Sequence, residues 1–475
     1  MQRDSIDFKN EKISVLFSKI FIPTLLGMFL SSTISVADGI FVGKGAGADA
    51  LAAVNIAAPF FMITTGLGLM FGSGVSVVSS IHLSKGKTKA ANINMTQAFT
   101  TSFLLMLIVS LVVLITPQSF ARLLGCSDRL MPLVLDYLYL IVPSLPFLVA
   151  LTIGMFVIRV DGSPTYSMLC EAVPAVINIV LDYVFVFPCR MGIKGAALAT
   201  AIAQVVGFVM VCVYMAGFHK TLSFYRPKFS ATALKLTARN IGYMVRLGLS
   251  SMISEVAISC IMITGNLVFI KYLHEEGVAA FSVACYCMPL AFMIANDIGQ
   301  SAQPIISFNY AVSQTQRVRK AAKLSLLTAL TSGLIVSFIC IVFSKTVIGL
   351  FLSQTDKAYT LATAGFPYFA VSFLFMTLNI TAIGYFQSVE NFKRSIFYMS
   401  LRGFIFVIPC FIVLPIVFGA AGLWFAVPLS EILTFLTIAV IFCCKSDDVN
   451  ICFITTFAAF FNIEVSNKGL LIKYN

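Results

Sequence analysis

The sequence predicts an all-α polytopic membrane protein with twelve transmembrane helices, arranged as two six-helix lobes that are related by a parallel repeat. The first observation is composition: 59% of the 475 residues are hydrophobic and 11% are charged, whereas soluble domains carry roughly 25% charged residues. The second is that apolar stretches of about twenty residues, long enough to cross a bilayer, recur along the whole chain. The third is a weak internal repeat between the two halves of the chain.

The apolar stretches are interpreted as helices. A transmembrane barrel requires strands of about ten residues with alternating polarity, and these stretches are longer and do not alternate. Helices satisfy the backbone hydrogen-bonding groups in lipid. The polar N-terminal segment "MQRDSIDFKNEKIS" lacks the apolar core of a cleaved signal peptide. The predicted spans are 15–40, 51–81, 93–116, 131–157, 164–188, 193–217, 241–271, 278–308, 322–343, 361–388, 394–418 and 420–444.

The repeat sets the domain organisation. "MGIKGAALA" (191–199) matches "FGAAGLWFA" (418–426), and "LAAVNIAAPFFMI" (51–63) loosely matches "VAAFSVACYCMPLAFMI" (278–294). Each half holds an even number of spans, so both enter the membrane in the same orientation, as in transporters with parallel repeats. The predicted parts are an N-terminal lobe (1–218), a cytoplasmic linker (219–240), a C-terminal lobe (241–445) and a cytoplasmic tail (446–475) that is interfacial or disordered.

The net charge of +12 is interpreted as a sign of membrane topology, and no nucleic-acid partner is expected. Most of the 32 Lys and Arg fall on one side of the predicted membrane. Cytoplasmic loops are enriched in Lys and Arg, so both termini are predicted to be cytoplasmic. The basic loops would then contact anionic lipid. Besides the N-terminal segment, they are 82–92, 159–163, 219–240, 311–323 and 389–394.

The sequence shows no pattern typical of an enzyme or a resident metal site. The 12 cysteines are scattered, mostly within the spans, and none forms a C-x2-C pair. They are interpreted as small apolar packing residues. The three histidines, His82, His219 and His274, lie in separate loops. With no nucleotide-binding loop and no paired-carboxylate signature, we expect no enzymatic activity and no cofactor.

Acidic residues inside the spans are the candidate functional groups. A charged side chain at the bilayer centre costs about 2.5–3.5 kcal/mol on insertion scales, so such residues usually mark an ion or substrate pathway. Asn178 precedes Asp182 by one turn, so their side chains share a helix face. Thr200 on the next span adds a hydroxyl, and Asp38 comes from the first span. These oxygens suit a bare alkali cation, or a proton shared between two acids. The other in-span acids, Glu255, Asp297 and Glu431, could alternatively be structural hydrogen-bonding groups.

Four segments occur in an order and at a spacing that resemble the multidrug and toxic compound extrusion (MATE) family, in particular its MepA-like bacterial multidrug export branch. The resemblance extends over nearly the whole chain up to about residue 445. The four segments are "VADGIFVGKGAGADALAAVNIAAPF" (36–60), "RVDGSPTYSMLCEAVPAVINIVLDYVFVF" (159–187), "MGIKGAALATAIAQ" (191–204) and "GQSAQPIISFNYA" (299–311).

The resemblance implies two lobes that face each other across a central cleft. It also implies efflux of small cationic, amphipathic drugs by antiport, driven by Na+ or H+, with no metal beyond a transported Na+. In family members with a site in the N-terminal lobe, the coupling cation is bound by residues that match Asp38, Asn178, Asp182 and Thr200. Pro23 matches a first-span proline at which some members bend; the alternative is a static kink. The expected partners are the substrates and membrane lipid, and the protein is expected to be a monomer.

The sequence departs from the family pattern at two acids in its second half. Glu255 lies in the seventh span, where a related branch has a functional Glu and the MepA-like pattern often has Gln. Asp297 stands where Gly or an apolar residue is usual. Both are predicted to bind substrate. The repeat places Pro409 opposite Asp182 and Val427 opposite Thr200, so the ion site is expected to be single and N-terminal.

The alternative function is that of a lipid-linked oligosaccharide flippase on a related fold. Such a protein needs cationic residues in its cleft to bind pyrophosphate. The few basic residues inside spans are Lys19, Arg246 and Arg402, all near predicted span ends. Acids outnumber them at depth, which favours cationic cargo. The sequence leaves sodium and proton coupling both open.

Overall fold

The computed structural model describes residues 6–46, 48–124, 126, 128–226, 230–352, 354–444, 465–466 and 469–470. Side chains are described for these residues except 31–40, 43–44, 46, 48, 51–52, 275, 441–444, 465–466 and 469–470. Most of the predicted tail therefore lies outside the described residues. Within it, β1 (Val465–Ser466) and β2 (Gly469–Leu470) pair antiparallel, with Val465 opposite Leu470.

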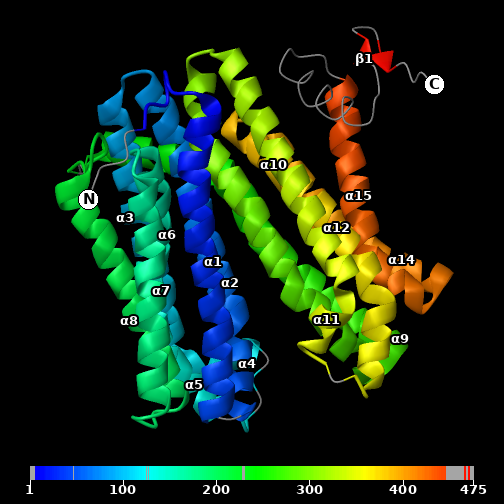
Figure 1. Ribbon diagram of the computed structural model, residues 1–475. Coiled ribbons are helices and arrows are strands. Elements are labelled where there is room, and N and C mark those ends of the chain that lie inside the picture. Colours follow the sequence, from blue (N-terminus) through cyan, green and yellow to red (C-terminus); the bar gives the residue numbers. More distant parts are fainter. Residues whose placement is uncertain are drawn as a thin grey trace. The chain divides into compact units, whose positions relative to one another are not determined.

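The described chain is otherwise helical (Figure 1). The helices before the linker are α1 (Ile13–Ala46), α2 (Ala48–Ser84), α3 (Thr88–Ile115), α4 (Pro117–Leu123), α5 (Met131–Ile141), η1 (Val142–Ser144), α6 (Leu145–Val160), α7 (Pro164–Val186), α8 (Ile193–Val213) and the π-helix η2 (Tyr214–Phe218). Those after it are α9 (Ala231–Ala311), α10 (Thr315–Val342), α11 (Ser344–Gly349), α12 (Lys357–Ser388), α13 (Phe392–Ser400), the π-helix η3 (Leu401–Ile405), α14 (Val407–Phe418) and α15 (Ala420–Cys444).

Twelve helical segments of the described chain are long and apolar enough to cross a membrane, which confirms the predicted number of spans. The predicted seventh and eighth spans form one element, α9, in which the backbone departs from helical geometry only at His274 (φ 56°, ψ −155°). The predicted fourth span comprises α5, η1 and α6. Its two prolines, Pro143 and Pro146, stand at the starts of η1 and α6, where a missing N–H is tolerated.

The repeat is visible in the backbone. Gly192, before α8, has φ 57° and ψ −134°, and Gly419, before α15, has φ 57° and ψ −141°. Both glycines are the second residue of the matched segments 191–199 and 418–426. A positive φ is easily adopted only by glycine. The two halves therefore make the same turn into their last span.

The chain divides into two compact units: a first unit of residues 1–11 and 18–256, and a second unit of residues 12–17 and 257–475. The division falls inside α9, between Val256 and Ala257. The first stretch of the seventh span thus belongs with the first unit. The lobe boundaries expected from the sequence stay predictions.

In the first unit, the linker binds to the ends of α3 and α6. The Asp161 carboxylate, 4% exposed, accepts hydrogen bonds from the backbone N–H groups of Lys220, Thr221 and Leu222 at 2.7–2.9 Å. It also accepts from the Thr221 and Tyr214 hydroxyls, at 2.7 and 2.8 Å. The start of the linker is therefore fixed to this unit.

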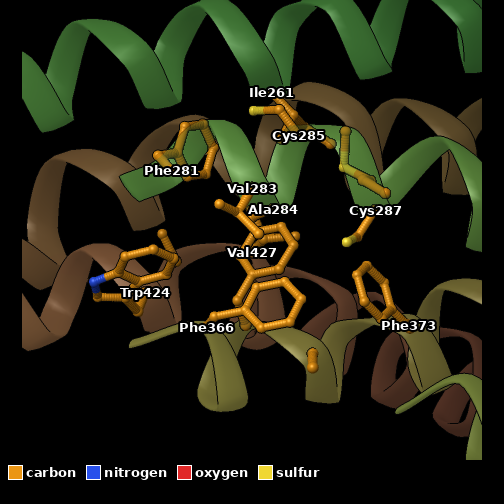
Figure 2. Close-up of a cluster of buried hydrophobic side chains, with 14 of the residues drawn as sticks. Ile261, Phe281, Val283, Ala284, Cys285, Cys287, Phe366, Phe373, Trp424 and Val427 are labelled. Carbon is orange, nitrogen blue, oxygen red and sulfur yellow. The ribbon is translucent and has the colours of Figure 1, made fainter. Parts of the chain in front are cut away.

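In the second unit, an aromatic core joins α9, α12 and α15. Figure 2 shows Phe281 of α9, Phe366 and Phe373 of α12 and Trp424 of α15 gathered in this cluster. All four side chains are at most 4% exposed. The ring of Phe281 also lies edge-on to Phe411 of α14, with centroids 6.3 Å apart. This core holds these four helices of the second unit together.

Candidate functional site

The candidate ion site lies between α7 and α8 in the first unit. The buried residues of α7 recur every three or four positions and so form one face of the helix. Both Asn178 and Asp182 belong to that face. Small residues of α8 permit close packing: a Cβ on Gly207 would lie 3.1 Å from Pro174 of α7, and a Cβ on Gly195 would lie 2.9 Å from Phe185. The sequence pattern thus directs the acid and the amide inward.

The structure brings together three of the four residues predicted for this site. Asp182 is 1% exposed and Asn178 is 3% exposed. Across the helix pair, Asn178 Nδ2 donates a hydrogen bond to Thr200 Oγ1, 3.3 Å away. The amide is thus bonded to the hydroxyl of α8 and lies one helical turn before the carboxylate on α7. Such oxygen ligands suit a hard monovalent cation, and the carboxylate alone can hold a proton.

The fourth residue, Asp38, has a side chain outside the described residues, although its backbone lies in α1. Helix α1 runs along α7. A Cβ on Gly27 would lie 2.8 Å from Glu171 Oε2, and Gly45 meets Val186. On α1, position 38 lies between Gly27 and Gly45. On α7, Asp182 lies between the residues that these glycines contact, Glu171 and Val186. The backbone at position 38 is therefore level with the middle of α7.

Ring contacts support this alignment of α1 and α7. Phe41, three residues after position 38, lies edge-on to Tyr183 and Phe187, with centroids 6.5 and 5.9 Å apart. Tyr183 directly follows Asp182. Pro23 stands within α1, which continues as one helix on both sides of it. The role of Pro23 as a bending point stays a prediction.

The two acids predicted to bind substrate lie in different units. Glu255 belongs to the first unit, where its Cβ lies 3.6 Å from the position that a Cβ on Gly66 of α2 would occupy. Asp297 belongs to the second unit, is 0% exposed and accepts a hydrogen bond from Ser301 Oγ at 3.2 Å. The seventh-span Glu255 thus packs with the helices of the ion-site unit. Substrate binding by either acid stays a prediction.

A charged cluster that the sequence analysis did not recognise lies in the second unit. Arg402 Nε is 2.6 Å from Glu431 Oε1, and Asn379 Nδ2 donates to Glu431 Oε2 at 2.8 Å. All three residues are at most 1% exposed. Arg402 was placed near a span end, but it lies in η3, inside the span Phe392–Phe418. Buried charges are usually paired. The occurrence of Arg402 in the span before that of Glu431 could therefore have indicated an ion pair.

Among the described residues, no group of three or more His, Cys, Asp or Glu could hold a metal ion. The site at Asp182 is of another kind, because two of its three ligand groups are an amide and a hydroxyl. Such a donor set fits a weakly bound, exchangeable monovalent cation better than a resident transition metal.

Comparison with known proteins gives one family and several similar proteins. The model of the MatE family matches residues 23–184 and 250–413. The chain is 25% identical over 310 residues to the "FAD transporter" of Shewanella oneidensis, covering 64% of this chain and 67% of that protein. It is 21% identical to the "Multidrug export protein MepA" of Staphylococcus haemolyticus, covering 89% of this chain and 92% of that protein.

Solved structures share the fold. One is described as the outward-facing conformation of a multidrug resistance MATE family transporter of the MOP superfamily, with a TM-score of 0.84 at 20% identity, covering 90% of this chain and 95% of that chain. A MOP superfamily transporter from Pyrococcus furiosus has a TM-score of 0.83 at 20% identity, covering 95% of this chain and 97% of that chain. At these identities the likeness concerns the fold alone.

Proposed function

Since the chain belongs to the MatE family of membrane transporters, we propose that it is an antiporter that exports cationic, amphipathic drugs in exchange for Na+ or H+. The similar multidrug export proteins support drug export. The similar proteins include no flippase among those described above, so the flippase alternative is not favoured. Alternating access between the two sides of the membrane is the proposed mechanism.

The observation that carries the proposal is the burial of Asp182 beside the Asn178–Thr200 hydrogen bond. A ligand shifts a conformational equilibrium only by its differential affinity for the two states. The coupling ion must therefore bind a group whose surroundings change between the two states. A charged carboxylate inside a span is costly in free energy, and this cost is removed when the carboxylate is neutralised. Neutralisation of Asp182 by a proton or Na+ would therefore change the relative free energies of the two states.

The residues have distinct proposed roles. Asp182 and Asp38 would carry the negative charge that receives the cation, while Asn178 and Thr200 would supply neutral oxygens. Cation binding would favour one state of the transporter, and the positively charged cargo would favour the other. Glu255 would act in cargo selection, so Glu255→Gln should change which drugs are exported more than it changes coupling.

The deciding experiment is transport by the purified protein in proteoliposomes. A fluorescent aromatic monocation serves as cargo, and either a Na+ gradient or a pH gradient is imposed without the other. Cargo movement against its own gradient under one condition identifies the coupling ion. Absence of gradient-driven movement under both conditions, with correctly folded protein, would refute cation-coupled antiport.

A second candidate function is export of flavin adenine dinucleotide. It is favoured by the similarity to the Shewanella oneidensis protein. This chain is more nearly identical to that protein than to the Staphylococcus haemolyticus protein, although over a shorter segment. The same proteoliposomes discriminate between the candidates. Flavin transport that the aromatic monocation does not inhibit would favour the dinucleotide, and monocation transport would favour drug export.

We also propose that both termini are cytoplasmic and that the protein acts as a monomer in a bacterial plasma membrane. The twelve apolar helices and the family make it a multi-pass membrane protein. The Lys and Arg asymmetry of the loops supports the orientation.

A further inference from the structure

The Arg402–Glu431–Asn379 cluster has the composition of an ion site that is already filled. The Glu431 carboxylate receives Arg402 Nε on one oxygen and Asn379 Nδ2 on the other. Asn379 Nδ2 also lies 2.9 Å from the Glu431 carbonyl oxygen, which fixes the amide against α15. Without the guanidinium, the remaining groups are a carboxylate and a neighbouring amide, the same chemical types as Asp182 and Asn178.

The cluster also retains unused hydrogen-bonding capacity. Among the described residues, Asn379 Oδ1 and Arg402 Nη2 have no hydrogen-bond partner. Nη1 of Arg402 has a contact of 3.9 Å with the Met399 sulfur. A pair selected only for stability would be expected to satisfy these groups, because each unsatisfied buried polar atom costs free energy. The spare amide oxygen adds a cation ligand beside the Glu431 carboxylate.

The repeat relates this cluster to a neutral position of the first unit. Matching of 191–199 with 418–426 places Glu431 opposite Gln204. Gln204 is 5% exposed and accepts a hydrogen bond from Ser144 Oγ at 2.7 Å. The second half therefore carries an added acid at this position, together with an added base on the preceding span. The two charges compensate each other inside the membrane.

We propose that Glu431 and Asn379 form a second monovalent-cation site, in the C-terminal half, which the guanidinium of Arg402 occupies as a tethered cation. The π-helical turn η3 carries Arg402, whose side chain contacts Glu431 of α15 and Met399 of α13. Because the occupant is covalently part of the chain, this site cannot exchange ions. Glu431 and Asn379 therefore do not contribute to ion coupling, whatever ion or cargo the first unit uses.

Chemical rescue of Arg402→Ala tests the proposal on the full-length protein in detergent. This variant leaves the buried Glu431 uncompensated, and we expect its Tm to fall by about 10 °C. Added low-millimolar guanidinium chloride should raise the Tm in a saturable, concentration-dependent manner, because the free cation binds the folded state. N-methyl-D-glucamine chloride at equal ionic strength, whose cation is too bulky for the vacated space, and urea serve as the solute controls.

Two further variants isolate the site. The double variant Arg402→Ala/Glu431→Gln has the same space but no carboxylate, so guanidinium should not stabilise it. Asp182→Asn changes the other candidate ion site and should not respond either. Absence of a saturable rise in the Tm of Arg402→Ala with guanidinium, or an equal rise in the double variant, would overturn the proposal. Because Tm is the readout, the outcome does not depend on the identity of the transported cargo.

A second comparison applies where Arg402→Ala is not recovered as folded protein. Arg402→Lys keeps a tethered cation, whereas Arg402→Met has a similar length and no charge. With Glu431 present, we expect the Lys variant to be the more stable and the better recovered. With Glu431→Gln this order should reverse. If Arg402→Met is at least as stable as Arg402→Lys while Glu431 is intact, the cation site is contradicted.

Discussion

The Asn178 side-chain amide donates a hydrogen bond to the Thr200 hydroxyl, with Nδ2 and Oγ1 3.3 Å apart. This contact joins α7 to α8 one turn before Asp182 on the buried face of α7. It fixes the positions of two neutral oxygen-bearing groups beside the buried carboxylate. The contact therefore links the packing of the first unit to its proposed ion chemistry.

Removal of the Thr200 hydroxyl should weaken binding of the coupling ion. Thr200→Val keeps the side-chain shape but leaves the Asn178 amide without this acceptor, at a cost of about 1.5 kcal/mol. Loss of the hydroxyl oxygen as an ion ligand, if of similar size and confined to the ion-bound state, corresponds to roughly tenfold in apparent ion affinity. The measurement is the ion concentration at half-maximal transport in proteoliposomes. Thr200→Ser retains the hydroxyl and should behave as the unsubstituted protein, whereas unchanged ion dependence in Thr200→Val would place the hydroxyl outside the site.

Loss of the charge at Asp182 should abolish gradient-driven export. Asp182→Asn keeps the size and hydrogen bonding of the side chain, so we expect the variant to fold and reach the membrane. Export should fall to that of protein-free liposomes, because the amide cannot take up a proton or balance a cation. Asp38→Asn should behave likewise, and the double variant should be no worse than either single one if the two acids act as a unit.

The matched control for these variants is Asp136→Asn. Asp136 is a partly exposed acid that pairs with Lys194 at 3.2 Å, and such surface pairs contribute about 0–1 kcal/mol. Export should persist in this control. Export at the unsubstituted rate by Asp182→Asn would move the coupling site elsewhere, and Glu255 would be the first residue to test.

Asp161 should control the attachment of the linker. Its carboxylate receives five hydrogen bonds, from three backbone N–H groups and the hydroxyls of Tyr214 and Thr221. Asp161→Ala should lower the free energy of unfolding by about 3 kcal/mol and expose the linker. Limited trypsin digestion should then cleave faster after Lys220, whereas the Arg226–Pro227 bond resists trypsin in either protein. Asp136→Ala is the control, and an unchanged cleavage rate in Asp161→Ala would show that other contacts hold the linker.

The proposed orientation can be tested by labelling single cysteines in a variant without native cysteines. Lys87 and Lys357 are both exposed, and the topology places them on opposite sides of the membrane. A membrane-impermeant thiol reagent should label Lys357→Cys from outside intact cells and should label Lys87→Cys only after permeabilisation. The reverse pattern would invert the assignment of both termini.

The number of spans was predictable because apolar length is a direct requirement of the bilayer. The inward direction of Asn178 and Asp182 was predictable for a similar reason, since a spacing of four residues fixes a shared helix face. The repeat itself was also visible in the sequence, although the positive φ angles that Gly192 and Gly419 share came only from the structure.

The structure also shows what the sequence pattern could not supply. Arg402 was described as lying near the end of a predicted span, and nothing in the sequence pattern pointed to a partner for it. Its partner Glu431 lies 29 positions further along the chain, and no periodicity connects residues at that separation. Likewise, the packing of Glu255 in the first unit depends on how α9 lies on α2, which is a tertiary feature. Its assignment to the second half followed only from chain order.

The contact between α2 and the first part of α9 yields the last prediction. In the first unit, Ser73 Oγ lies 3.0 Å from Ser251 Oγ. On either side of this contact, Gly248 meets the Met70 carbonyl oxygen and Gly74 meets the Met244 carbonyl oxygen, both too closely to admit a Cβ. Small residues permit such close crossings between membrane helices.

Gly248→Ala should therefore destabilise the protein by about 1–3 kcal/mol, the usual cost of overpacking, because the atom that its methyl group meets is backbone and cannot move aside. Gly242→Ala is the matched control on the same helix, where a Cβ would meet nothing within 4 Å. That variant should be neutral or slightly stabilising, since alanine has the higher helix propensity. Thermal unfolding of both variants in the same detergent measures the difference. Equal Tm values for the two variants would show that α2 and α9 can separate at this crossing without loss of stability.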